Sequence, residues 1–335
     1  WHIIYWHGGG FFMPMFKEHW PLVSAMVEHT GASISVPLYN VIPEHDYHPA
    51  NKQADAVYEK VAAEWGDDKI ALSGDSAGGN MALGVDKIMI HGMRSRIVNA
   101  PSFTGDKVVG AILFEMTMDR EIGGKPAAAA LWDDHGVVPF LKVDKGLRDL
   151  HDGVQMMKPM PDLDTLLAKG ASKGVFGTKM RSVINLANPE GIAAIVKQQF
   201  EVGMQIIGHG LMPMIEPEVN IKSAERAECD AILHGELKKA LDALPEDKTV
   251  MLKLSIPVES NLYADLVAHP RTARVVALSG GYSTDDACSE LAKNNGMIAS
   301  FSRALLEKLQ NGMSDEEFNA ALDSSIQQIY DASAT

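Results

Sequence analysis

The chain has 335 residues, of which 46% are hydrophobic and 22% are charged, a composition typical of globular proteins with a substantial core. Its formal net charge is -14 and its pI is near 5.3. A nucleic-acid backbone or an anionic membrane would be repelled by this charge, so neither is expected as a partner. A small anionic substrate is compatible with it, because a few Lys and Arg side chains in a cleft can dominate the local field.

Two cysteines are present, Cys229 and Cys288, and neither belongs to a CxxC pair or a metal-ligand pattern. The sequence also contains no run of about 18 apolar residues and no signal-peptide pattern. We therefore expect a cytoplasmic protein, and these patterns predict no metal and no cofactor. The sequence leaves the oligomeric state open.

Short apolar runs alternate with longer amphipathic stretches along the whole chain, a pattern that predicts βα units around a parallel sheet. Ten strands are predicted, near residues 2–6, 33–38, 69–73, 108–114, 138–143, 175–181, 210–216, 249–255, 274–279 and 296–302. Ten exceeds the eight strands of a (βα)8 barrel, which suggests a barrel with an additional segment.

Five of the last seven predicted strands carry charged residues late in the strand. In residues 250–256, the two-residue period of a strand places Lys253 on the face opposite Leu252 and Leu254. The same alternation separates Lys142 from Leu141. Buried charges are costly and are retained mainly where they pair or react, so the repeated placement predicts an active site at the C-terminal rim of a barrel.

Ten ordered sequence blocks fill the chain from about Asp86 to Thr335. They are GAILFEMTMDRE, PFLKVDKGL, DGVQMMKPMPDLD, GVFGTKMRS, QQFEVGMQII, LMPMIEPEVNI, VMLKLSIP, VVALSGGYS, GMIASFSRAL and SDEEFNAALD. Together they resemble the bacterial class I fructose-1,6-bisphosphate aldolases. The resemblance implies a glycolytic lyase that cleaves this phosphorylated sugar to dihydroxyacetone phosphate and glyceraldehyde 3-phosphate without a metal.

The resemblance also implies roles for individual residues. Lys253 takes the Schiff-base position, Glu216 that of the proton-transfer acid and base, and Lys179 lies beside the amine. The remaining positions match substrate contacts: Lys142, Arg181 and Glu218, and, for the ketose phosphate, Ser279, Gly280, Gly281, Ser302 and Arg303.

These residue types suit the chemistry. An amine must be unprotonated to attack a ketone, and a dry interior and a second cation both lower its pKa. A carboxyl group can then move protons through carbinolamine formation and dehydration. The turn at residues 279–281 precedes a capping box from Ser283 to Asp286, which directs backbone N–H groups towards an anion.

The first 84 residues differ from an aldolase. HGGG at residues 7–10, VPLYNVIPEHDYHPA and GDSAGG at residues 74–79 resemble the hormone-sensitive-lipase group of α/β hydrolases. The resemblance implies an oxyanion hole at His7, Gly8, Gly9 and Gly10 and a nucleophile, Ser76, on a strand-to-helix elbow. In that group the acid and the histidine of the triad come later, in a part this chain lacks. A serine carboxylesterase with an incomplete triad is therefore an alternative function.

We interpret the chain as a chimera with its sequence junction near Gly84. In our hypothesis residues 70–73 replace the missing first aldolase strand, and Asp75 replaces the catalytic aspartate at the end of that strand. A shift of one residue would turn Asp75 to the wrong face, and Asp75 is alternatively only an elbow residue. The predicted fold is α/β, with a (βα)8 TIM-like barrel over residues 67–335 and a βαβα extension over residues 1–66. A catalytically inactive scaffold is a further alternative.

Overall fold

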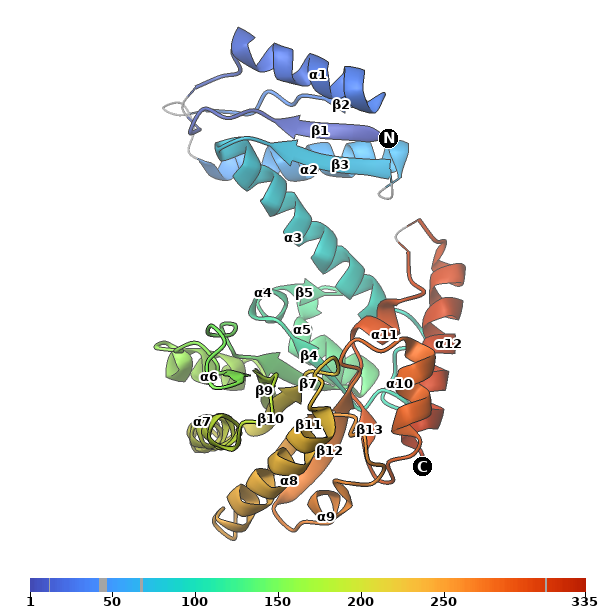
Figure 1. The fold of residues 1–335 in the computed structure, drawn as a ribbon. Helices are drawn as coiled ribbons and strands as arrows, with labels where there is room; N and C mark the ends of the chain where they lie inside the picture. Colours follow the sequence, from blue (N-terminus) through green and yellow to red (C-terminus); the bar gives the residue numbers. More distant parts are fainter. Residues whose placement is uncertain (12, 42–46, 67–68, 311) are drawn as a thin grey trace. The chain divides into compact units, whose positions relative to one another are not determined.

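The computed structural model describes residues 1–11, 13–41, 47–66, 69–310 and 312–335. The chain forms two compact units (Figure 1). The first comprises Trp1–Ile97 with Gln310–Phe318, and the second comprises Val98–Leu309 with Asn319–Thr335. The long C-terminal helix α12 (Asp315–Ser333) therefore contributes residues to both units.

The first unit contains a small parallel sheet in the order β2-β1-β3. Its strands are β1 (His2–Trp6), β2 (Ser33–Ser35) and β3 (Ile70–Gly74), and its helices are η1 (Lys17–His19), α1 (Trp20–Thr30), α2 (Tyr47–Trp65) and α3 (Ala77–Val98). Every residue of β1 is buried, as expected of a continuous apolar run covered on both faces.

The two faces of β1 pack against different helices. Ile4 and Trp6 belong to a cluster with Tyr58 of α2 and other buried residues of α2 and α3, whereas Ile3 and Tyr5 pack in a cluster with Val23 of α1. This division follows from the two-residue period of a strand.

The second unit contains seven parallel strands in the order β13-β12-β11-β10-β9-β7-β4. They are β4 (Gly110–Leu113), β7 (Val138–Lys142), β9 (Gly177–Ile184), β10 (Met212–Val219), β11 (Val250–Ser255), β12 (Thr272–Leu278) and β13 (Ile298–Ala299). The short strand β8 (Val154–Gln155) pairs antiparallel with β9, and β5 (Glu121–Ile122) forms a hairpin with β6 (Lys125–Pro126).

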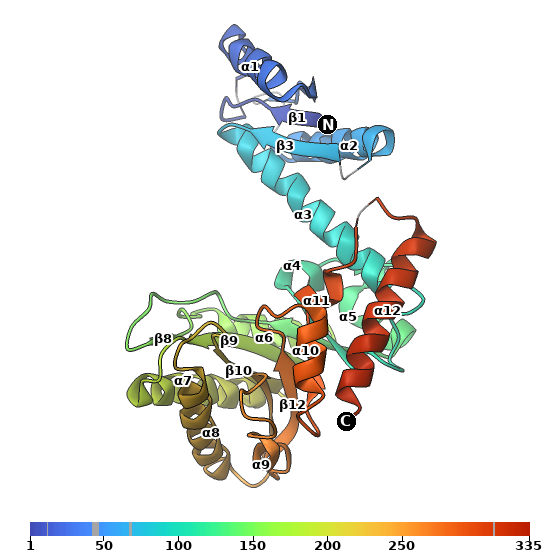
Figure 2. The ribbon, with the colours of Figure 1, turned by 45° about the vertical axis from the view of Figure 1, so that its right-hand side comes forward.

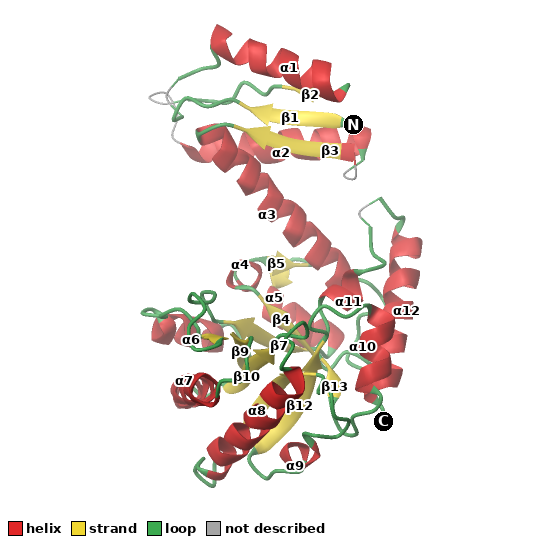
Figure 3. Ribbon diagram, viewed as in Figure 1, coloured by secondary structure: helices red, strands yellow, loops and turns green. Residues whose placement is uncertain are grey.

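Helices connect these strands and cover the outside of the curled sheet (Figures 2 and 3). They are α4 (Glu115–Met118), α5 (Ala127–Ala129), η3 (Ala130–Asp134), α6 (Leu163–Ser172), α7 (Pro189–Gly208), α8 (Arg226–Asp242), α9 (Ala264–Val267), α10 (Thr284–Leu291) and α11 (Arg303–Leu306). Helix α7 packs on β10 and on the neighbouring α8. In the part of the chain that the structure describes, no helix is long and apolar enough to span a membrane.

The predicted strand positions are confirmed, because each of the ten predicted segments overlaps a strand of the structure. The α/β fold with a curled parallel sheet is likewise present. The short strands β5, β6 and β8 were not predicted, since two-residue pairings leave almost no periodic pattern in a sequence.

The prediction that residues 70–73 form the first barrel strand is not confirmed. Strand β3 instead pairs with β1 along its whole length, from the His2↔Ile70 pair to the Trp6↔Gly74 pair. The outer edges of β4 and β13 have no partner strand among the described residues, so the larger sheet is an open half-barrel. The compact units divide the chain at residues 97/98 and on either side of residues 310–318, whereas the predicted domains divide it at residues 66/67.

An apolar layer fills the inner face of the half-barrel. Phe140, Met214 and Val276 are buried there, and the partly buried Met251 and other strand residues pack against them. Because side chains two residues apart share a face, Lys142, Glu216 and Lys253 occupy the next layer towards the strands' C-terminal ends. The apolar layer thus forms the floor beneath these polar groups.

Candidate active site

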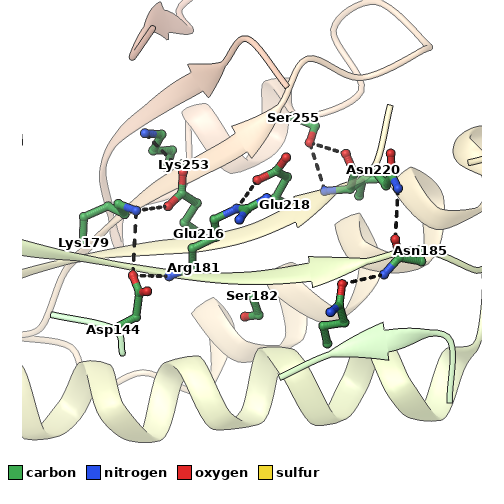
Figure 4. Close-up of polar contacts among 12 residues, drawn as sticks. Asp144, Lys179, Arg181, Ser182, Asn185, Glu216, Glu218, Asn220, Lys253 and Ser255 are labelled. Atoms are coloured by element: carbon green, nitrogen blue, oxygen red, sulfur yellow. Dashed lines mark hydrogen bonds and ion pairs between the residues drawn. The ribbon is translucent and has the colours of Figure 1, made fainter. Parts of the chain in front are cut away.

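Three charged side chains meet on adjacent strands. Lys179 of β9 lies 2.8 Å from Oε2 of Glu216 on β10, and Lys253 of β11 lies 3.1 Å from Oε1 of the same carboxylate. All three residues are buried, with exposed fractions of 7%, 3% and 7% for Lys179, Glu216 and Lys253. Figure 4 shows the carboxylate of Glu216 between the two amines. Met214 pairs with Met251, which places Glu216 level with Lys253 on the neighbouring strand.

The environment of Lys253 lowers the pKa of its amine. Burial is the largest cause, and the positive charge of Lys179 acts in the same direction, whereas the negative charge of Glu216 opposes both. Burial acts because a low-dielectric interior disfavours the charged form. A larger fraction of the amine is therefore neutral and nucleophilic than in a lysine exposed to water.

Asp144 extends this cluster towards Lys142. Lys142 donates to Oδ1 of Asp144 at 2.6 Å and to its carbonyl oxygen at 2.9 Å. The other oxygen, Oδ2, lies 3.8 Å from Lys179 Nζ and accepts a hydrogen bond from the backbone N–H of Arg181 at 3.2 Å. The charges thus alternate from Lys142 through Asp144, Lys179 and Glu216 to Lys253.

Arg181 and Glu218 form a second ion pair beside this cluster, between the guanidinium Nε and the carboxylate Oε2 (Figure 4). Burial lowers the pKa of Arg181, but its hydrogen bond and ion pair with Glu218 outweigh burial, and the net shift is upward. A permanently charged, fork-shaped donor of this kind suits a phosphate or a sugar hydroxyl group.

Buried polar side chains hold the strands that carry these charges. Gln199 of α7 accepts a hydrogen bond from the backbone N–H of Glu216 at 2.8 Å and donates to the hydroxyl of Ser182. Ser255 accepts from the backbone N–H of Val219 at 2.9 Å and donates to its carbonyl at 2.7 Å. Because these bonds fix the backbone at the strand ends, the charged groups are held in place before any substrate arrives.

The predicted phosphate turn follows β12. Gly280 and Gly281 have φ values of +62° and +112°, which side-chain-bearing residues adopt at a cost. A methyl group placed on Gly281 would lie 3.7 Å from Nη2 of Arg303, so the guanidinium lies beside the turn. Ser302 is the N-cap residue of α11 and directly precedes Arg303. The predicted N-cap is present, since Ser283 accepts a hydrogen bond from the backbone N–H of Asp286 at 3.1 Å.

The phosphate turn and the lysine cluster lie on neighbouring strands. Lys253 pairs with Val276 of β12, three residues before Ser279, and Ala277 pairs with Ala299 of β13. The structure therefore brings the predicted aldolase residues to the C-terminal ends of consecutive strands. They are Lys142, Lys179, Arg181, Glu216, Glu218 and Lys253 in one group and Ser279, Gly280, Gly281, Ser302 and Arg303 in the other.

Asp75 lies in the first unit. Its Oδ1 accepts hydrogen bonds from the hydroxyl of Tyr5 at 2.6 Å and from the backbone N–H of Gly8 at 2.8 Å. These partners come from β1 and from the glycine loop after it, because β3 pairs with β1. The predicted replacement of the aldolase aspartate is thus not supported, and the contacts are those of an elbow residue.

The hydrolase-like motifs keep their expected local geometry. Ser76 has a φ of +50°, the strained backbone of a nucleophile elbow. A methyl group on Gly78 would lie 1.9 Å from the carbonyl oxygen of Trp6, so glycine is required there. Gly9 and Gly10 have φ values of +124° and +62°, and the His7 carbonyl accepts from Tyr39 at 2.6 Å. Among the described residues, no hydrogen bond joins the Ser76 hydroxyl to a histidine or a carboxylate.

The comparisons with known proteins divide the chain into a hydrolase-like part and an aldolase-like part, as its sequence motifs do. Residues 3–102 match the family model for the alpha/beta hydrolase fold, and residues 90–257 match the model for fructose-bisphosphate aldolase class-I. The fructose-bisphosphate aldolase class 1 of Synechocystis sp. is 54% identical over 247 residues, which cover 74% of this chain and 82% of that protein. The chain belongs to the class I fructose-bisphosphate aldolase family.

The fold of this aldolase family member is also that of a solved relative. A fructose-bisphosphate aldolase from Plasmodium falciparum superposes with a TM-score of 0.60 at 20% identity, covering 72% of this chain and 82% of that one. At this identity the likeness establishes the fold alone.

Some residues of the aldolase site were missed by the sequence analysis. Asp144, Gln199 and Ser255 were given no role in the site, although the strand alternation already places Asp144 on the same face as Lys142, two positions later. That spacing was the one available signal for it. Within the described ranges, no group of three or more His, Cys, Asp or Glu side chains is arranged to hold a metal ion.

Proposed function

We propose that this chain cleaves fructose 1,6-bisphosphate to dihydroxyacetone phosphate and glyceraldehyde 3-phosphate through a Schiff base on Lys253. The observation that carries the proposal is the buried Lys179–Glu216–Lys253 cluster, in which one carboxylate contacts two amines at 2.8 and 3.1 Å. A lysine with a lowered pKa beside a proton-transferring carboxyl group is the arrangement that a Schiff-base enzyme needs.

The neutral amine of Lys253 attacks C2 of the open-chain ketose and forms a carbinolamine. Glu216 gives a proton to the departing hydroxyl group, which leaves as water and produces an iminium ion. The iminium accepts the electron pair of the C3–C4 bond as Glu216 removes the proton of the C4 hydroxyl. Glyceraldehyde 3-phosphate leaves, C3 of the resulting enamine is protonated, and water hydrolyses the imine to release dihydroxyacetone phosphate.

The substrate's two phosphates are assigned to two groups of donors. The 279–281 turn, Ser302 and Arg303 bind the ketose phosphate, since backbone N–H groups and a guanidinium favour an anion. Lys142 and Arg181 bind the other phosphate and the rest of the sugar, with Glu218 orienting the guanidinium. A small phosphorylated sugar, and neither nucleic acid nor membrane, is the partner that this site and the net charge of -14 favour. The free thiols of Cys229 and Cys288 are in line with a cytoplasmic enzyme.

Borohydride trapping tests the proposal. The protein is incubated with dihydroxyacetone phosphate, reduced with sodium borohydride, digested and analysed by peptide mass spectrometry. We expect a single added ligand mass on the peptide that contains Lys253, together with turnover of fructose 1,6-bisphosphate in a coupled assay. Folded protein without an adduct would overturn the proposal and support an inactive scaffold. An adduct on another lysine only would overturn the assignment to Lys253.

Replacing Lys179 by methionine is expected to move the pH dependence of trapping upward. The positive charge of Lys179 lowers the pKa of Lys253, and its removal also leaves Glu216 free to stabilise the protonated amine. Both effects raise that pKa, so the neutral fraction of the amine at pH 7 falls. The initial trapping rate, measured across neutral and alkaline pH in both proteins, checks this. An unchanged or lower inflection would contradict it.

The elbow serine is expected to be catalytically silent. Ser76 has the backbone of a nucleophile elbow, but its hydroxyl lacks a hydrogen-bonded base among the described residues. Hydrolysis of p-nitrophenyl acetate should therefore be equal in the unaltered protein and in Ser76→Ala. A rate that falls to background only in Ser76→Ala would instead establish the esterase alternative.

A further inference from the structure

A buried arginine links the strand of Lys253 to the phosphate turn. Arg226 is the first residue of α8, and its exposed fraction is 6%. One terminal nitrogen, Nη2, donates to the carbonyl oxygen of Ile256, three residues after Lys253. The other, Nη1, lies 3.5 Å from the hydroxyl of Tyr282, which directly follows the 279–281 turn. The guanidinium of Arg226 therefore contacts both the residue after β11 and the residue after the 279–281 turn.

The partner of Arg226 on the same helix is Asp230, one turn later. Its Oδ2 lies 3.7 Å from Nε of Arg226 and accepts a hydrogen bond from the backbone N–H of Val258 at 3.0 Å. Burial raises the pKa of the Tyr263 hydroxyl, and the negative charge of the nearby Asp230 raises it further. The first turns of α8 thus hold the loop after β11 at residues 256 and 258, with Tyr263 close to the same carboxylate.

The loop before α8 touches the phosphate turn as well. A methyl group placed on Gly280 would lie 2.7 Å from Cγ2 of Ile221, so this side chain packs directly on the turn. Three consecutive loops, after β10, β11 and β12, consequently converge on Arg226 and its neighbours. These contacts fix the position of the turn relative to Lys253.

Burying these charged side chains costs free energy, which indicates that the network has a role other than stabilising the fold. Burying an arginine and an aspartate removes both charges from water, and well-packed apolar residues are often at least as stable. The forked guanidinium offers what an apolar residue cannot, two directed donors on one rigid plane. Tyr282 N–H donates to the Ser279 carbonyl at 3.0 Å, so the position of Tyr282 is tied to the turn itself.

We propose that Arg226 is a positioning residue that sets the 279–281 turn, through Tyr282, at the distance from Lys253 at which a ketose phosphate is bound. The inference rests on the proposed function. It predicts that disturbing the Arg226–Tyr282 contact weakens recognition of the phosphate and leaves Schiff-base formation with a ketone that lacks phosphate unchanged.

Trapping with two ketones tests this positioning role. The concentration that gives half-maximal borohydride trapping is measured for dihydroxyacetone phosphate and for dihydroxyacetone in Arg226→Lys and Tyr282→Phe. Lysine keeps the charge next to Asp230 but cannot reach both acceptors, and Tyr282→Phe removes only the hydroxyl contact. We expect a rise of about tenfold for the phosphate ester in Arg226→Lys, a smaller rise in Tyr282→Phe, and no change for dihydroxyacetone.

Tyr330→Phe, on an exposed part of α12, is the matched control and should leave both concentrations unchanged. Circular dichroism confirms that each variant is folded, and Tyr282→Phe serves alone if Arg226→Lys does not fold. An equal rise of the half-maximal concentration for both ketones would show that Arg226 only stabilises the fold. An unchanged concentration for both would show that Arg226 does not position the turn. Absence of trapping in the unaltered protein would overturn the proposed function instead, and the inference with it.

Discussion

Replacing Lys253 by methionine is expected to abolish both the borohydride adduct and the cleavage of fructose 1,6-bisphosphate. Methionine fills a similar volume in the buried site but has no amine with which to attack the ketone. Loss of a covalent nucleophile usually lowers turnover by on the order of 10⁵-fold, which here means a fall to background. A coupled assay for glyceraldehyde 3-phosphate and mass spectrometry of the reduced protein measure the two losses.

A matched control separates loss of chemistry from loss of fold. Lys239 lies on α8 with a largely exposed side chain, and Lys239→Met should retain full trapping and turnover. The melting temperature of Lys253→Met should stay close to that of the unaltered protein, because a desolvated amine is removed from the interior. A ligand adduct that persists in Lys253→Met would show that another amine carries the reaction.

The larger part of the site could be predicted from strand periodicity and the resemblance. The two-residue alternation places Lys142, Glu216 and Lys253 on the inner face, and parallel strands bring their C-terminal ends to one rim. In the structure these side chains indeed stand directly above Phe140, Met214 and Met251. The strands themselves were predictable because each is a short apolar run between loop residues.

The pairing of β3 could not be predicted in the same way. The run at residues 70–74 indicates a strand, but periodicity within a strand does not say which distant strand lies beside it. Ile4 and Trp6 of β1 share a cluster with Met81 of α3, on which Ile70 and Leu72 also pack. That shared core selects β1 as the partner of β3, and Asp75 then lies next to Gly8.

The hydrogen-bond partners of buried polar side chains on helices could not be predicted either. Gln199 and Arg226 act from α7 and α8 on backbone atoms of strands and loops that are distant in sequence. A helix shows its apolar stripe in the sequence, but a single polar residue within that stripe gives no sign of its partner. Only the three-dimensional arrangement identifies the backbone groups that these residues satisfy.

The reacting groups lie close together although the half-barrel is open. Lys142, Lys179, Glu216 and Lys253 come from β7, β9, β10 and β11, which are consecutive neighbours in the sheet. Their spacing is fixed by the backbone pairing of these strands, such as the pairs from Met212↔Gly177 to Val219↔Ile184. A strand that closed the barrel would instead adjoin β4 and β13, at the outer edges of the sheet. The pairing that holds these four side chains together therefore does not depend on such a strand.

Replacing Glu216 by glutamine is expected to lower turnover by about 10²–10⁴-fold, the usual contribution of a general acid and base. Glutamine keeps the size of the side chain but can neither give up a proton to the departing hydroxyl nor take one from the C4 hydroxyl. It also removes the negative charge that raises the pKa of Lys253, so this pKa should fall further. The neutral amine becomes more abundant at pH 7, yet the reaction becomes slower.

The lower pKa of Lys253 and the slower reaction in Glu216→Gln can be measured separately. In Glu216→Gln the inflection of trapping against pH should move downward, the reverse of the change in Lys179→Met, while the maximal rate falls. Glu190→Gln, exposed at the start of α7, is the matched control and should change neither. Full turnover in Glu216→Gln would assign proton transfer to another carboxylate, and Asp144, 3.8 Å from Lys179 Nζ, would then be the residue to replace next.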